Sequence, residues 1–156
     1  MITRPRPEIV LRPLTPALVF LALAACQSGG PDGSVLPGNP DDDHPFSEVA
    51  ADETLHFTGT EPFWGGDVTG EKMLYKTPEQ PDGQTITVSR FAGRGGLSYS
   101  GTLDGAPFTM AVTTGICSDG MSDRSYPFVV TLQLGDAMRT GCAWSDTHAF
   151  KGPEAP

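Results

Sequence analysis

From Thr54 onward the chain consists of short apolar or alternating runs separated by turn sequences, a pattern typical of all-β domains. The clearest run is Gln84–Phe91, in which Ile86 and Val88 fall on one face and the intervening threonine and serine residues fall on the other. Similar runs recur about every 8–12 residues, which is the spacing of strands in small sandwiches and barrels. The other predicted strands are Leu55–Phe57, Phe63–Trp64, Lys72–Lys76, Leu97–Ser100, Phe108–Val112, Tyr126–Leu134 and Ala137–Trp144.

Turn sequences containing glycine separate these runs. Pro81-Asp82-Gly83, Gly93–Gly96, Asp104-Gly105 and Gly135-Asp136 each predict a reversal of the chain, because glycine accepts the backbone angles that tight turns need. A helical period is found nowhere in this part of the sequence, apart from one turn over Ser118–Arg124. The pattern therefore predicts an all-β fold, a small antiparallel β-barrel or sandwich of about seven or eight strands with one short helical turn.

The N-terminal segment has the organisation of a signal peptide. Arg4, Arg6 and Arg12 precede the apolar run Ala17–Ala25, which is much shorter than the roughly 20 residues that cross a bilayer. The residues Leu23-Ala24-Ala25-Cys26 then resemble a bacterial lipobox. This resemblance implies cleavage before Cys26 and attachment of acyl chains there, and two or more chains hold a protein stably on a membrane.

We therefore expect residues 1–25 to be a lipoprotein signal peptide and Cys26 to be the lipidated residue. Gln27 in the next position resembles the pattern that directs lipoproteins to the outer membrane, where the protein would face the periplasm. The alternative is an ordinary secretory signal followed by an incidental cysteine.

The composition divides the remaining chain into a tether, a domain and a tail. Residues 26–53 are rich in glycine, proline, aspartate and serine and offer little apolar surface to bury, so they predict a disordered tether. The strand pattern occupies residues 54–150, which we expect to form the β-domain, and residues 151–156 predict a disordered tail.

The charge of the chain is strongly negative, with a formal value of −9. Without the first 25 residues the chain keeps 7 basic and 18 acidic residues, a formal charge of −11. Because such a surface repels phosphate backbones, we expect no nucleic-acid partner. The charge is explained either by solubility in a crowded compartment or by attraction to a basic protein partner.

With Cys26 acylated, the remaining cysteines are Cys117 and Cys142. In the oxidising envelope two remaining thiols predict a disulfide, and closing a loop of this length contributes about 3.5 kcal/mol in the chain-entropy model. Metal binding is the weaker interpretation, because the sequence has no Cys-x-x-Cys motif and no histidine close to either cysteine. We expect neither a metal nor a cofactor.

Two longer motifs occur in the predicted domain. Gly59-Thr-Glu-Pro-Phe-Trp64 precedes the loop Cys117-Ser-Asp-Gly-Met-Ser-Asp123, which continues to Tyr126-Pro127, and Gly141-Cys142 follows near the end. Together they resemble a family of uncharacterised bacterial lipoproteins, over about residues 55–145. The resemblance implies an envelope location and a β fold but no settled activity. It also suggests a broad likeness to other small envelope β-domains, such as stress-linked lipoproteins and membrane-bound lysozyme inhibitors.

The loop motif has two interpretations. In the structural one, its aspartate and serine side chains cap backbone N–H groups and Arg124 pairs with Asp119 or Asp123. The first motif is then the entry to a strand, with Phe63 or Trp64 in the core. In the functional one, an exposed tryptophan lies beside the loop and forms a recognition patch with it. The predicted patch consists of Glu61, Trp64, Asp119, Ser122, Asp123 and Arg124.

No catalytic motif is recognisable in the sequence. There is no Gly-x-Ser-x-Gly elbow, no His-Glu-x-x-His pair and no glycine-rich phosphate loop. We therefore expect a non-catalytic envelope lipoprotein that acts as a binding module, with no catalytic residues. The first alternative is an inhibitor of a cationic hydrolase such as lysozyme. A more remote one is a hydrolase that pairs Glu61 with Asp119 or Asp123.

Overall fold

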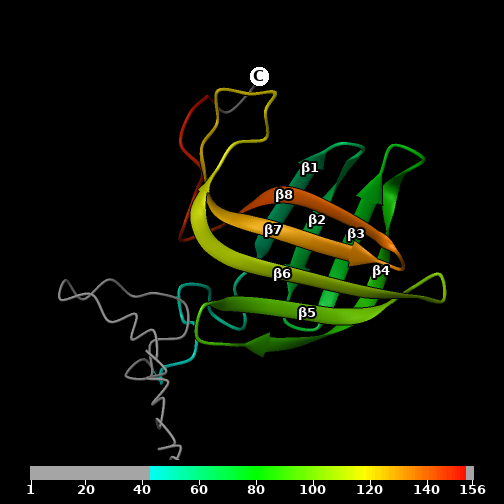
Figure 1. Cartoon of the computed structure of the whole chain (residues 1–156), viewed down its shortest axis with the longest axis horizontal. Helices are drawn as coiled ribbons and strands as arrows, with labels where there is room; N and C mark the ends of the chain where they lie inside the picture. Colours follow the sequence, from blue (N-terminus) through cyan, green and yellow to red (C-terminus); the bar gives the residue numbers. More distant parts are fainter. Residues whose placement is uncertain (1–42, 154–156) are drawn as a thin grey trace, which may run out of the picture. The chain divides into compact units, whose positions relative to one another are not determined.

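The computed structural model describes residues 43–153, which form a closed barrel of eight antiparallel strands (Figure 1). Each strand pairs with the next along the chain, and the first pairs with the last. The all-β prediction is confirmed, and the barrel is the form that occurs. The strands are β1 (Leu55–Thr60), β2 (Phe63–Thr69), β3 (Lys72–Thr77), β4 (Gln80–Ala92), β5 (Gly96–Leu103), β6 (Ala106–Cys117), β7 (Tyr126–Leu134) and β8 (Ala137–Ser145).

Side chains fill the interior of the barrel. Alternate residues of β1 and β7 are buried, and Ile86 and Val88 of β4 are both buried, as the sequence predicted. An eight-stranded barrel is just narrow enough for its own side chains to occupy the centre. The largest buried side chains of the core are Trp64, Tyr75, Tyr99, Phe57, Phe108, Phe128, Met73, Met110, Leu55 and Leu132.

The turn predicted at Pro81-Asp82-Gly83 lies inside β4 instead. The chain reverses at Pro78 and Glu79, so that Thr77 pairs with Gln80. The register between β3 and β4 then shifts, and Gly83 has a positive φ of 77°. The glycine therefore serves a bulge in the ladder, which the sequence does not distinguish from a turn.

The helical turn predicted over 118–124 is wrong, since no helix occurs among the described residues and this segment forms bends. Gly120 has a positive φ of 71°, which a right-handed helix does not accept. The Asp119 side chain also accepts hydrogen bonds from the N–H groups of Met121 and Ser122, in place of backbone carbonyls. Within residues 43–153 there is thus no helix that could span a membrane.

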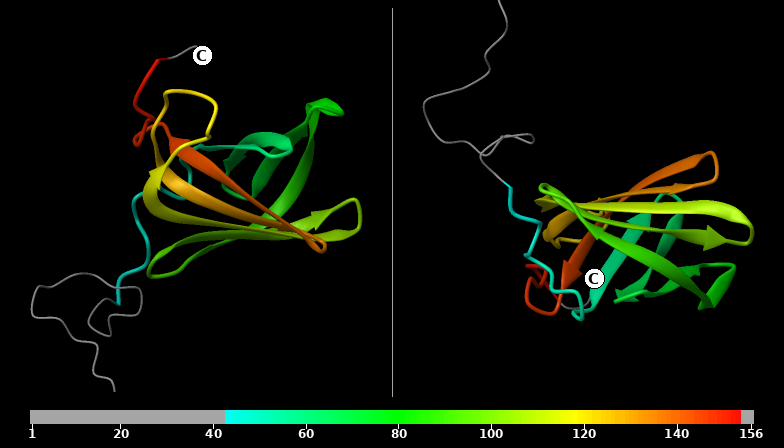
Figure 2. Two further views of the ribbon diagram at one scale, coloured as in Figure 1. Left: turned by 45° about the horizontal axis from the view of Figure 1, so that its top comes forward. Right: turned by 90° about the horizontal axis from the view of Figure 1, so that it is seen from below.

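The end of the predicted tether belongs to the folded domain. The backbone N–H of Phe46 donates to the carbonyl oxygen of Gly93 at 2.7 Å, and Arg90 donates to the carbonyl oxygen of Val49 at 2.8 Å. Val49 is fully buried in the core, and the cyan segment lies against one end of the barrel in both views of Figure 2. The end of the predicted tether is therefore attached to the barrel, because the apolar side chains of Val49 and Phe46 pack against the core within an otherwise polar stretch.

The C-terminal boundary also differs from the prediction. The backbones of Ser125 and Lys151 exchange two hydrogen bonds of 2.8 Å, so the start of the predicted tail is attached to the loop before β7. Glu53 accepts hydrogen bonds from the backbone and hydroxyl of Thr147 at 2.9 and 2.6 Å.

The predictions for the signal peptide, Cys26, the first part of the tether and the last three residues lie outside the described residues.

Candidate functional site

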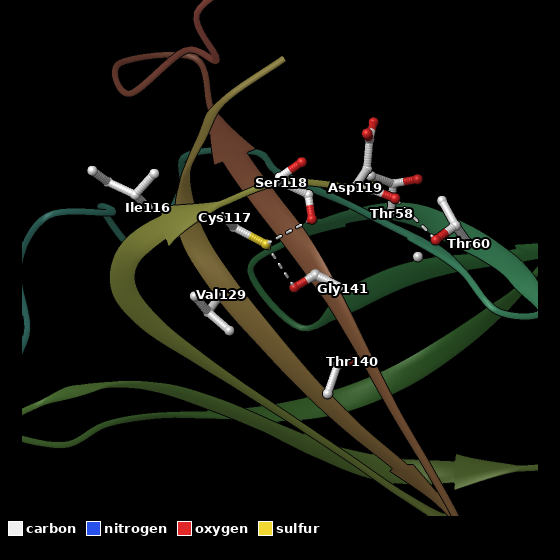
Figure 3. A pocket seen from close by; sticks show the side chains of 10 residues that line it. Thr58, Thr60, Ile116, Cys117, Ser118, Asp119, Val129, Thr140 and Gly141 are labelled. Atoms are coloured by element: carbon white, nitrogen blue, oxygen red, sulfur yellow. Dashed lines mark hydrogen bonds between the residues drawn. The ribbon is translucent and has the colours of Figure 1, made fainter. Parts of the chain in front are cut away.

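The barrel closes along a short seam between its first and last strands. Leu55–Thr58 of β1 pairs with Cys142–Ser145 of β8, and the ladder ends at the pair of Thr58 with Cys142. Beyond it, the end of β6 and the loop that follows cross the outer face of the barrel (Figure 3). We call residues 117–125 the seam loop.

A disulfide attaches the seam loop to β8. Cys117 and Cys142 are bonded, with their Cα atoms 5.6 Å apart, which confirms the predicted pairing. The bond crosses the outer face of β7, because β7 lies between β6 and β8 in the sheet and Val129 is the register partner of Cys142. The Cys117 sulfur also lies 3.3 Å from the carbonyl oxygen of Gly141, a packing contact because an oxidised sulfur has no hydrogen to donate (Figure 3).

A hydrogen bond attaches the seam loop to β1 on the other side. The hydroxyl of Thr60 donates to the backbone carbonyl oxygen of Asp119 at 3.1 Å. Together with the disulfide, this bond joins β1 and β8 through the loop where the two strands no longer pair. The loop therefore closes the barrel wall from outside.

The Asp119 carboxylate organises the seam loop from within. It accepts hydrogen bonds from the N–H groups of Met121 and Ser122 at 3.0 and 2.8 Å, and from the hydroxyls of Ser122 and Tyr126 at 2.7 and 2.9 Å. Burial raises the pKa of Asp119, but these bonds outweigh it and hold the pKa well below its usual range. These contacts are the capping network of the structural interpretation.

Trp64 belongs to the same seam and is not part of an exposed patch. Its side chain is 3% exposed, which agrees with the structural interpretation and contradicts the exposed Trp64 of the functional one. A Cβ atom on Gly59 would lie 2.1 Å from the indole Nε1, and one on Gly141 would lie 2.9 Å from Cζ2. The indole therefore fills the space that these two glycines leave in the wall, which explains why both motifs contain a glycine.

The remaining residues of the predicted patch lie on or beside the seam loop. Glu61 and Asp123 are exposed, whereas Ser122 and Arg124 are partly buried. Glu61 occupies the turn between β1 and β2, where its peptide bond to Pro62 is cis.

Arg124, for which a carboxylate neighbour was predicted, contacts the C-terminal segment. Its Nε donates to the carbonyl oxygen of Pro153 at 2.9 Å, and its guanidinium lies 4.5 Å above the ring of Phe150. The cation therefore fastens the end of the described chain to the seam loop.

Three exposed apolar side chains were missed by the sequence interpretation. Phe63, Met121 and Ile116 are 51%, 67% and 90% exposed. Strand alternation could have indicated Phe63, because adjacent residues in a strand point to opposite faces and Trp64 takes the inner one. Nothing in the pattern marks the other two.

Two neighbouring grooves accompany these side chains on the outer face. One, of about 330 Å³, runs along the seam between Thr58–Thr60 and Thr140–Gly141, with Ile116 and Val129 beside it (Figure 3). The other, of about 270 Å³, lies between the β1–β2 hairpin and the seam loop, and we call it the hairpin groove. Its lining includes Thr58, Thr60, Phe63, Met121, Arg124 and Trp144.

His56 lies next to Trp144 on this outer face. The two rings stack with their centroids 5.2 Å apart, and His56 Nδ1 lies 2.5 Å from Asp67. Its Nε2 lies 3.5 Å from Asp146, which makes that contact weak. The histidine therefore joins β1, β2 and the end of β8. No cluster of three or more potential metal ligands was found within residues 43–153.

No family model, curated protein or solved structure matches this chain. The resemblance to a lipoprotein family stays a prediction, supported by the motifs alone. What the structure adds is a physical role for the motif residues, which meet at one seam although they are up to 83 residues apart between Gly59 and Cys142.

Proposed function

We propose that this protein is a lipid-anchored envelope protein whose barrel is a non-catalytic binding module. In this proposal Cys26 carries the lipid, and the outer surface around the seam loop contacts a partner protein. The ligand is not a small molecule held inside the barrel, because aromatic and aliphatic side chains fill the interior.

The observation that carries the proposal is the position of the exposed apolar side chains. Among the five large apolar side chains that are exposed in residues 43–153, Phe63, Met121 and Ile116 line the two grooves on the outer face. Beneath them, a disulfide and the Asp119 network hold the backbone in place. A rigid surface with clustered apolar side chains is typical of protein interaction sites.

The charge of the chain favours a basic partner. A formal charge of −9 repels nucleic acids and anionic lipid headgroups, and it accelerates encounters with cationic proteins.

Catalysis receives no comparable support, because the Asp119 carboxylate is engaged in four hydrogen bonds of the capping network and so is poorly placed to act as an acid or base.

The test is co-purification from the bacterial envelope with the full-length chain as bait. The site variant is Phe63→Ser/Met121→Ser, and the matched control is Phe91→Ser/Met138→Ser, whose side chains are 68% and 70% exposed away from both grooves. The proposal predicts one partner that the control retains and the site variant loses. A partner retained by both variants would place the interaction elsewhere on the barrel.

The lipid anchor is tested separately with Cys26→Ser. We expect this variant to lose incorporation of labelled palmitate and to leave the membrane fraction, while the barrel keeps its melting temperature. A variant that stays membrane-bound would contradict the anchor, and the cysteine would then be incidental to an ordinary secretory signal.

A further inference from the structure

The hairpin groove has apolar side chains on both of its walls. Phe63 projects from the β1–β2 hairpin, Met121 projects from the seam loop, and Trp144 of β8 also lines the groove. Aromatic residues and methionine are enriched in the buried centres of protein interfaces, because they offer large contact areas. This composition suits an apolar side chain from a partner.

The size of the groove limits what it can hold. Its volume of about 270 Å³ lies just below the range for small-molecule pockets, which begins at roughly 300 Å³. One large side chain of a partner is a better match than a whole cofactor, and the polypeptide that carries it would then run over the rim.

The rim of the hairpin groove is acidic on both walls. Glu61 lies in the hairpin turn next to lining residue Thr60, and Asp123 lies between lining residues Ser122 and Arg124. Both carboxylates are exposed. The lining cation, Arg124, already contacts Pro153 and Phe150, and the net charge of the whole chain is negative. Residues that flank the anchor are therefore favoured when they are basic.

We infer that the hairpin groove binds a partner segment in which one large apolar side chain is flanked by lysine or arginine residues. The apolar side chain packs between Phe63 and Met121, and the flanking cations lie near Glu61 and Asp123. This inference rests on the proposed function and names the chemistry of the partner at the same surface.

The test uses a synthetic fluorescein-labelled peptide, Lys-Arg-Gly-Trp-Gly-Arg-Lys, and the full-length chain in detergent. Binding is measured by fluorescence anisotropy at about 50 mM and about 500 mM salt, because rim electrostatics are screened at high salt. Two comparison peptides replace the tryptophan by serine or all four basic residues by glutamate. We expect each comparison peptide to bind at least about tenfold more weakly than the tryptophan peptide. One lacks the apolar anchor, and the other has the same sign of charge as the rim of the groove.

Two protein variants locate the bound peptide. Phe63→Ser/Met121→Ser removes apolar wall contacts, and Glu61→Gln/Asp123→Asn removes the two rim carboxylates. Matched controls are Phe91→Ser/Met138→Ser and Glu79→Gln/Asp82→Asn, which change equally exposed residues elsewhere. Since all these side chains are exposed, the melting temperatures should equal that of the unaltered chain.

The inference is supported if both site variants weaken binding about tenfold and both controls leave it unchanged. It is overturned if the tryptophan peptide does not bind, if the glutamate peptide binds equally well, or if the site variants bind like the controls. If the peptide does not bind while envelope co-purification still depends on Phe63 and Met121, the proposed function stands and this inference alone fails.

Discussion

The Asp119→Ala substitution should destabilise the barrel far more than the exposure of the loop suggests. The change removes the acceptor of four hydrogen bonds, two from backbone N–H groups and two from hydroxyls. A typical hydrogen bond contributes about 0.5–1.5 kcal/mol, and loss of a capping side chain costs about 0.5–2 kcal/mol. For a partly exposed network we expect a loss of about 3 kcal/mol, which lowers the melting temperature by roughly 10–15 °C.

The assay is urea unfolding with the disulfide intact, followed by the fluorescence of Trp64 and Trp144. Asp123→Ala is the matched control, because Asp123 is exposed and no side-chain hydrogen bond is found for it within residues 43–153. Its unfolding free energy should change by no more than about 0.5 kcal/mol. Equal effects of the two substitutions, or a loss below about 0.5 kcal/mol for Asp119→Ala, would refute the account of the loop.

The same prediction has a dependence on pH. The pKa of Asp119 is lowered in the folded chain, although burial opposes the shift, so the carboxylate stabilises the fold fully above its ordinary unfolded value of about 3.9. This contribution is lost as the pH falls through the lower pKa of the folded state. The difference between the unaltered chain and Asp119→Ala should therefore be constant near neutrality and shrink below about pH 4.

Three further substitutions test other parts of the structure. The double variant Cys117→Ala/Cys142→Ala should lose about 3.5 kcal/mol in unfolding free energy, the chain-entropy value for a separation of 25 residues. Gly59→Ala should lose about 2 kcal/mol, because its Cβ would lie 2.1 Å from the indole packed over it, whereas Gly95→Ala, with nothing within 4 Å, should be nearly neutral by thermal unfolding. Burial raises the pKa of Glu53, but hydrogen bonds outweigh it and lower the pKa to about 2, so Glu53→Gln should destabilise the chain at pH 7 and much less at about pH 3.

Local alternation was sufficient to predict most strands of the barrel. Ile86 and Val88 alternate with polar residues, and a one-residue slip would expose both, so the sequence determines which face of β4 is inside. Glycine is more ambiguous. Gly83 was expected in a turn but lies in a bulge, because turns and bulges both use its positive φ.

The parts that the sequence did not predict depend on contacts between distant residues. Val49 is fully buried although it lies in a polar, proline-containing stretch. The average composition of such a stretch does not reveal that one of its residues is buried. Similarly, Phe63 and Trp64 are both large and apolar, so hydrophobicity alone does not indicate which of them is buried. Only Gly59 and Gly141, which leave space for an indole, decide that Trp64 is buried and Phe63 exposed. The disulfide was predictable because the prediction needed only the number of cysteines and the assumption of an oxidising compartment.

The most direct test of the account is site-specific photo-crosslinking of the full-length chain in living cells. A photoreactive phenylalanine analogue would replace Phe63 in one strain and Phe91 in the other, two phenylalanines that are 51% and 68% exposed. The account predicts that position 63 forms a covalent adduct with one defined basic envelope protein and that position 91 does not. Adducts at both positions, or none at position 63, would contradict the claim that the surface over the seam loop is the binding site.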